Sequence, residues 1–316
     1  MKSTVAKWIY LAMIVIVAIP FTHFGLSWEA GAPLALFLGL VFAMIFENPM
    51  PRFNKKCSKY LLQAAVVGLG FGMNLIDSLK SGAEGMAFTV VSVLGVMIVG
   101  VAVGYGLHIN RKTSYLISSG TAICGGSAIA AVGPVIKANE KEMAVSLGVI
   151  FILNAIALFI FPPIGHWLGM TQEQFGTWAA IAIHDTSSVV GAGEVYGPQA
   201  LEIATLIKLT RALWIIPLSL VTMLIFREKG SKISIPWFIF LFILAMVANT
   251  YCNLPENVTS TLVLIAKRAM VVTLFLIGAS LSIKTIKSVG SRPLVLALLL
   301  WAVIGFSSLA VVLWTM

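Results

Sequence analysis

Five successive polar residues interrupt an apolar segment of the chain: His184, Asp185, Thr186, Ser187 and Ser188. A charged side chain at the centre of a bilayer costs roughly 2.5–3.5 kcal/mol. If this segment lies in a membrane, Asp185 must therefore be paired, protonated or in a wet cavity. Histidine titrates near neutrality, and His184 adjoins this carboxylate. The cluster predicts a coupling or gating role with protons or sodium ions. The alternative is a loop at the membrane surface.

A second stretch, residues 120–129, combines small and hydroxyl side chains in an apolar setting, among them Thr121, Cys124, Gly125, Gly126 and Ser127. Adjacent glycines loosen a helix, and unwound backbone at membrane depth is tolerated only inside protein or along a wet cavity. The N-terminus of a half-helix presents N–H groups that suit an anion. We therefore expect a broken helix that binds substrate. The alternative is that small residues let helices pack closely.

The same stretch has a partner later in the chain. A shift of 153 residues brings residues 124–128 onto 277–281, so that Gly278, Ala279 and Ser280 fall on Gly125, Gly126 and Ser127. The shift also relates several predicted spans, with five spans between the members of each pair, which is typical of an inverted-topology repeat. The two breaks are expected to cross near the bilayer centre and to bind the substrate together.

Four cations fall inside apolar segments: Lys208, Arg211, Lys267 and Arg268. Residues 208 and 211 are three apart and share one face of a helix. Ionisable residues at membrane depth are functional candidates by default, and an excess of positive charge favours an anionic substrate. The alternative is structural pairing with Asp185 or with two other acids, Glu194 and Glu202.

The elements that must position these residues follow from composition. The chain has 316 residues, of which 59% are hydrophobic and 10% charged. Soluble domains carry about 25% charged residues, so we expect an all-α membrane protein with about eleven spans. Segments 114–136 and 175–190 are each expected to cross the membrane once. The predicted divisions are an extra N-terminal helix (1–30), a first repeat (31–166, broken helix 114–136) and a second repeat (173–316, broken helix 260–283).

The net charge of +9 could suggest nucleic acid, but the basic residues lie in short loops, where they orient a membrane protein instead. With a cytoplasmic N-terminus, fourteen Lys and Arg residues fall on the inside and three (Lys80, Lys137 and Lys141) on the outside. This bias predicts an odd number of spans and a C-terminus outside the cytoplasm. The three cysteines show no metal-binding spacing, and no metal or cofactor is expected.

Together, residues 120–129 and 184–193 resemble the YeiH-like sulfate exporter family of bacterial inner-membrane proteins. The resemblance covers nearly the whole chain, and Gly126 stands where the family usually has alanine. The family is distantly similar to sodium/proton antiporters and bile-acid sodium symporters. This implies a core bundle with crossing broken helices, a panel (scaffold) bundle, elevator-type movement and a homodimer. A small oxyanion is the expected substrate.

We therefore expect a secondary transporter for a small anion (sulfate, sulfite, or a small sulfonate or carboxylate), with proton or sodium coupling. A channel is an alternative, although the sequence has neither charge rings nor repeated filter loops. A less favoured alternative is an intramembrane enzyme in which Ser127 and His184 act as nucleophile and base. We expect no enzymatic activity.

Overall fold

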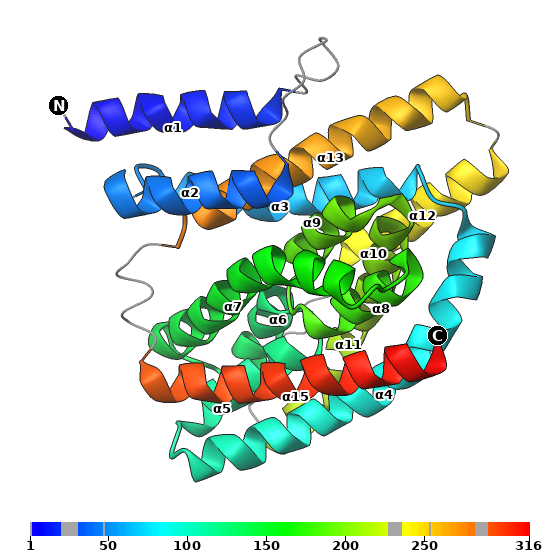
Figure 1. The fold of residues 1–316 in the computed structure, drawn as a ribbon. Helices are drawn as coiled ribbons and strands as arrows, with labels where there is room; N and C mark the ends of the chain where they lie inside the picture. Colours follow the sequence, from blue (N-terminus) through cyan, green and yellow to red (C-terminus); the bar gives the residue numbers. More distant parts are fainter. Residues whose placement is uncertain (1, 20–30, 47, 227–235, 253, 282–289) are drawn as a thin grey trace. The chain divides into compact units, whose positions relative to one another are not determined.

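The computed structural model describes the chain except for residues 1, 20–30, 47, 227–235, 253 and 282–289 (Figure 1). The described residues form helices and contain no strand. They divide into two compact units: unit 1 comprises Met1–Ser78 and Trp237–Ile283, and unit 2 comprises Leu79–Pro236 and Lys284–Met316. The units do not follow the boundaries of the predicted 5+5 repeat, which stays a prediction.

Among the described residues, five helical segments are long and apolar enough to cross a membrane: Thr89–Gly106, Glu140–Trp167, Pro198–Phe226, Glu256–Gly278 and Ser291–Thr315. Shorter apolar helices accompany them. The expected fold class, an all-α multi-pass membrane protein, is confirmed.

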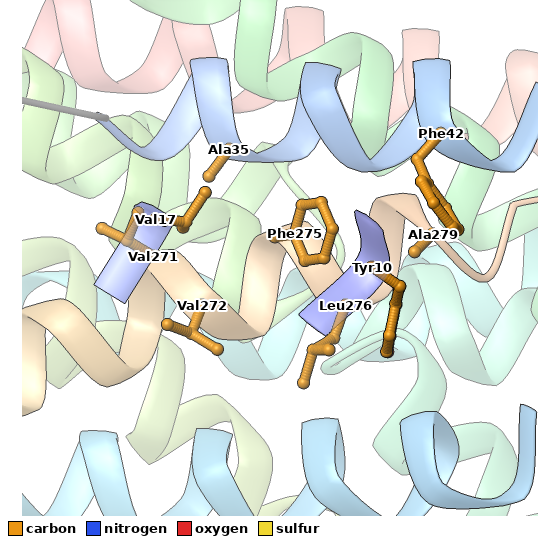
Figure 2. Close-up of a cluster of buried hydrophobic side chains, with 9 residues drawn as sticks. All are labelled: Tyr10, Val17, Ala35, Phe42, Val271, Val272, Phe275, Leu276 and Ala279. Carbon is orange, nitrogen blue, oxygen red and sulfur yellow. The ribbon is translucent and has the colours of Figure 1, made fainter. Parts of the chain in front are cut away.

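Unit 1 contains α1 (Lys2–Ala18), α2 (Ala32–Phe46), α3 (Pro51–Gly70), α12 (Trp237–Tyr251) and α13 (Glu256–Gly278). Its core is an apolar cluster in which α1, α2 and α13 meet (Figure 2). Figure 2 shows the ring of Phe275 on α13 between Ala35 and Phe42 of α2. Where these rings and aliphatic side chains would otherwise be exposed to water, their burial stabilises the unit.

Helices α2 and α13 approach closely through two glycines. A Cβ atom added at Gly278 would lie 2.4 Å from the carbonyl oxygen of Leu36, and one at Gly39 would lie 2.2 Å from that of Phe275. Small residues permit this contact between membrane helices. For Gly278, the structure therefore shows the packing role that the sequence left open as an alternative.

Helix α13 runs without interruption from Glu256 to Gly278, and a turn follows at Ala279 and Ser280. The expected break of segment 260–283 is thus the end of a helix. Its second half would fall in residues 282–289, outside the described residues. The expected crossing of this break with Gly125 stays a prediction, because the two belong to different units.

Unit 2 contains α4 (Leu75–Gly106) from residue 79 onward, and the further helices α5 (Arg111–Ala122), α6 (Gly126–Val135), α7 (Glu140–Trp167), α8 (Gln172–Ala182), α9 (Thr186–Tyr196), α10 (Pro198–Leu213), α11 (Ile215–Phe226) and α15 (Ser291–Thr315).

Helices α5 and α6 form a hairpin, hereafter hairpin 1. The helix breaks at residues 123–125, as expected, but the chain then folds back. The ammonium of Lys112, at the start of α5, donates to the carbonyl of Lys137, just after α6, at 3.0 Å. In one straight helix these residues would lie about 37 Å apart. The expectation that segment 114–136 crosses the membrane as one span is therefore wrong.

Helices α8 and α9 form a second hairpin, hereafter hairpin 2. The rings of Phe175 and Tyr196 stack with their centroids 3.8 Å apart, and the hydroxyl of Tyr196 donates to the carbonyl of Met170 at 2.6 Å. A straight helix would separate Phe175 and Tyr196 by about 31 Å. The expected span over 175–190 is corrected in the same way. Each hairpin is about as long as one span, so segment length alone could not distinguish the two arrangements.

Helix α7 links the two hairpins. Its N-terminus is fixed by a capping box, in which Asn139 and Glu142 each accept a backbone N–H of the other residue. The open end of hairpin 1 lies at this start, since Lys137 precedes the helix by three residues. Hairpin 2 follows the far end, after Trp167, roughly 42 Å along the 28-residue helix. The hairpins therefore enter unit 2 from opposite ends of α7.

Candidate functional site

The tips of the two hairpins meet. Tip 1 is residues 123–125 and tip 2 is residues 183–185, each between two half-helices. A Cβ atom added at Gly125 would lie 3.2 Å from the carbonyl oxygen of His184, and Gly125 has a φ of 60°. Glycine adopts such a backbone without steric cost. Within unit 2, Gly125 thus contacts the polar cluster at His184 as well as Ile150 of α7.

Tip 2 is held by Asn154, which lies in the middle of α7. Its side-chain oxygen accepts the backbone N–H groups of His184 at 3.1 Å and Asp185 at 3.2 Å. A break in a helix leaves such N–H groups without intrahelical partners. Asn154 therefore positions tip 2 from the helix that follows hairpin 1.

Tip 1 is held from the helix that follows hairpin 2. Arg211 on α10 donates from Nη2 to the carbonyl of Ala122 at 2.6 Å and from Nη1 to Ser92 Oγ at 2.9 Å. The carbonyl of Ala122 belongs to the C-terminal end of α5, where the helix dipole favours a cation. Each hairpin tip is thus braced by a side chain from the helix that follows the other hairpin.

Lys208 braces tip 2 as well. Its ammonium donates to the carbonyls of Ile183 at 2.6 Å and Ala180 at 3.2 Å, at the C-terminal end of α8. Lys208 and Arg211 have no exposed surface, so the expectation that they are embedded is confirmed. Backbone carbonyls accept hydrogen bonds from both side chains, and Ser92 Oγ accepts one from Arg211, so none of these partners is an acid.

Asp185 is the N-cap of α9. Its Oδ2 accepts the backbone N–H of Ser187 at 3.1 Å and the Ser187 hydroxyl. Aspartate is among the preferred N-cap residues. The five polar residues 184–188 are at most 7% exposed, so the alternative of a surface loop is wrong.

Several buried polar atoms near the tips have no hydrogen-bond partner among the described residues. They are Nδ1 and Nε2 of His184, Nδ2 of Asn154, Nε of Arg211 and Oγ1 of Thr121. Each belongs to a group that can donate a hydrogen bond. Buried polar atoms in native proteins are normally paired. A cluster of unpaired donors beside two cations is therefore a place where an anion can bind.

Helix α15 packs against hairpin 2 and bonds to it through two tryptophan side chains. The indole N–H of Trp301 donates to the carbonyl of Ala182 at 3.1 Å, and that of Trp178 donates to the carbonyl of Gly305 at 3.0 Å. The ring of Trp301 also lies edge-on to His184, with centroids 6.5 Å apart. The imidazole of His184 thus has the indole ring of Trp301 on one side.

The predicted site residues divide between the units. Thr121, Cys124 and Gly125 are buried at tip 1, whereas Gly126 is partly exposed and Ser127 is exposed. Unit 2 brings these residues together with Lys208, Arg211 and the 184–188 cluster. Unit 1 contains the remaining predicted site residues, which are Gly278, Ala279, Ser280, Lys267 and Arg268. Lys267 and Arg268 lie on α13 and are partly exposed.

Sequence reasoning missed Asn154. The residue is the one amide side chain in the apolar middle of a 28-residue helix, and an amide at such a depth is a signal in itself. It also missed the reciprocal bracing, because that pattern depends on the hairpin geometry.

Comparisons with known proteins identify a family of membrane proteins over nearly the whole chain. The family described as "Conserved hypothetical protein 698" matches residues 8–297. A UPF0324 membrane protein of Bacteroides thetaiotaomicron is 62% identical over 288 residues, covering 90% of this chain and 87% of the relative. A UPF0324 membrane protein of Porphyromonas gingivalis is 53% identical over 328 residues, covering 99% and 98%. No solved structure matches the chain.

Proposed function

The chain belongs to the family of UPF0324 membrane proteins, as its two motifs predicted, and from that premise we propose that it is a secondary transporter of a small anion. One observation carries the proposal. Buried donors without partners, on Asn154, His184 and Arg211, gather where the tips of two opposed hairpins meet. An anion between the tips would satisfy these donors and offset the excess positive charge.

Alternating access follows from the opposed hairpins. Hairpin 1 closes the site from one end of α7 and hairpin 2 closes it from the other. Withdrawal of one tip at a time would open the site to one side of the membrane and then to the other. Movement of a whole bundle against the other, as in an elevator, would carry the same site across the bilayer.

Coupling is assigned to His184 and Asp185, with Thr186, Ser187 and Ser188 as the surrounding gate. Asp185 caps α9, so a proton or sodium ion at its carboxylate would change the stability of tip 2. The substrate atoms are assigned to the tip 1 residues and to Lys208 and Arg211. We propose separately that unit 1 contributes to substrate binding through Gly278–Ser280, Lys267 and Arg268.

The proposed location is the bacterial inner membrane, with the N-terminus in the cytoplasm. Hairpin 1 returns to the side from which it enters. Lys137 and Lys141 therefore join the fourteen inside cations, and Lys80 alone stays outside. The positive-inside rule thus favours this orientation more strongly than it did with eleven crossings.

The test is transport by purified protein in proteoliposomes. Labelled sulfate, sulfite, methanesulfonate and acetate would be supplied in turn under imposed proton or sodium gradients. Saturable uptake of at least one anion, dependent on a gradient, is expected. Absence of uptake for all four under both gradients would contradict the proposal. Uptake that does not saturate would favour a channel.

A further inference from the structure

The buried charges at the hairpin tips do not balance. Among the described residues, the Asp, Glu, Lys and Arg side chains that are buried are Asp185, Lys208 and Arg211, all in unit 2. With Lys208 and Arg211 protonated, and with no coupling ion taken up by Asp185 from solution, two cations against one carboxylate leave one net positive charge. The count is the same if a proton passes from Lys208 to Asp185. His184 adds no charge at about pH 8, where histidine is ordinarily neutral.

Two further acids of unit 2 lie farther from the tips along their helices. Glu194 is nine residues from Asp185 along α9, roughly 14 Å, and lies toward the open end of hairpin 2. Glu202 precedes Lys208 by six residues on α10, roughly 9 Å along the helix axis. Both side chains are partly exposed, so solvent screens their effect at the tips.

An uncompensated charge in a low-dielectric interior is costly. A bound monoanion would bring the net charge of this cluster to zero, whereas a dianion would reverse its sign and leave a negative charge buried. We propose that the anion held between the tips is a monoanion of the sulfonate or carboxylate class, and that Asp185 sets this selectivity by its negative charge. This inference rests on the proposed function.

The geometry lets the charge of Asp185 be changed without removing its structural role. Its carboxylate accepts N–H and O–H groups of Ser187 at the start of α9. Asparagine and serine cap helices about as well as aspartate. Asp185→Asn and Asp185→Ser therefore raise the net charge by one unit while each keeps a cap for α9.

Methanesulfonate and sulfate make a matched pair of probes. Both are tetrahedral about sulfur and similar in size, but they carry one and two negative charges. Binding of each to the full-length protein would be measured by calorimetry in detergent, in sodium-free buffer at about pH 8 and matched ionic strength. The wild type should bind methanesulfonate at least about tenfold more tightly than sulfate, since the surplus charge of sulfate is uncompensated.

Both Asp185 variants should shift this preference toward sulfate by at least about tenfold, since the cluster then carries two net positive charges. The control is Glu140→Gln, which adds the same charge at an exposed position in the first turn of α7 and should leave the preference unchanged. A wild type that prefers sulfate, or a preference that neither Asp185 variant shifts, would overturn the inference. Failure of the wild type to bind methanesulfonate would also overturn the inference, whereas the proposed function fails only if all four anions of the uptake assay give no uptake.

Discussion

Each unit buries an asparagine between helices, and the two residues are used differently. In unit 1, Asn54 accepts from the Tyr10 hydroxyl at 2.9 Å and donates to the carbonyl of Leu276 at 2.8 Å and to Ser280 Oγ at 2.7 Å. In unit 2, Asn154 accepts twice, but its Nδ2 has no partner. A fully paired buried amide fixes a structure. A half-paired one leaves a donor for a ligand.

The glycines differ in the same way. Gly278 has ordinary helical backbone and serves a close contact with Leu36, whereas Gly125 has a left-handed backbone at a hairpin tip. Similar small-residue patterns therefore serve packing in unit 1 and a helix break in unit 2. What separates them is the pairing of the polar groups around them.

The largest effect is expected from Arg211→Met. The change removes the donor to Ala122 and half of the buried positive charge, while it roughly keeps the side-chain volume. We expect proteoliposome uptake to be abolished. The control Arg111→Met alters an exposed arginine of the same unit that lies over the Phe226 ring. Equal loss of uptake in both variants would contradict the site assignment.

The two asparagines give the next test. Asn154→Asp keeps the oxygen that accepts from tip 2 and replaces the free donor by an anionic oxygen. Anion affinity should fall about 10- to 100-fold, as expected for the loss of a hydrogen bond to a charged group. Asn54→Asp should instead lower the free energy of unfolding by about 1–3 kcal/mol, seen as a lower melting temperature, with anion affinity unchanged. The comparison fails if the two variants behave alike.

The two glycines should separate stability from transport. Gly278→Ala places a Cβ against the backbone of Leu36 and should cost about 1–3 kcal/mol of unfolding free energy through overpacking. Gly125→Ala strains a backbone with φ 60° and ψ −123° by about 1–3 kcal/mol and displaces tip 1, so uptake should fall more than stability does. Thermal unfolding and uptake per folded protein would be measured together. If Gly125→Ala kept the uptake rate of the wild type, the assignment of Gly125 to transport and of Gly278 to packing would be wrong.

The smallest effect is expected from Thr121→Val. Its hydroxyl is buried and unpaired beside tip 1, and a hydrogen bond to a charged group is worth about 1.5–3 kcal/mol. The KM for uptake should therefore rise about tenfold, at the low end of the range for Asn154→Asp, because Thr121→Val adds no negative charge. Thr177→Val, at a second buried and unpaired hydroxyl on α8, should leave KM unchanged. A larger change at Thr177 than at Thr121 would place the anion elsewhere.

Much of this site could be predicted from residue type alone. Glycine pairs, buried lysine and arginine, and a run of five polar residues stand out against an apolar background. The break at Gly125 and the burial of Asp185, Lys208 and Arg211 followed from the free-energy cost of polar groups in a membrane. The hairpins did not follow, because hydropathy reports how much apolar chain is present and not whether it turns back.

The pairing of distant segments was the other gap. The repeat shift linked Gly125 to Gly278 through their similar small residues, whereas the described contact joins Gly125 to His184. Small residues are common wherever membrane helices pack, so their recurrence does not specify a partner. Asn154 was overlooked for the opposite reason, since a single amide in a long apolar helix forms no motif.

A structure determined with bound methanesulfonate tests the central claim most directly. The account predicts an anion between tips 1 and 2, within hydrogen-bond distance of Asn154 Nδ2 and near Arg211, with both hairpins folded back on themselves. An anion bound away from the tips, or segments 111–135 and 172–196 each crossing the membrane as one straight helix, would contradict it.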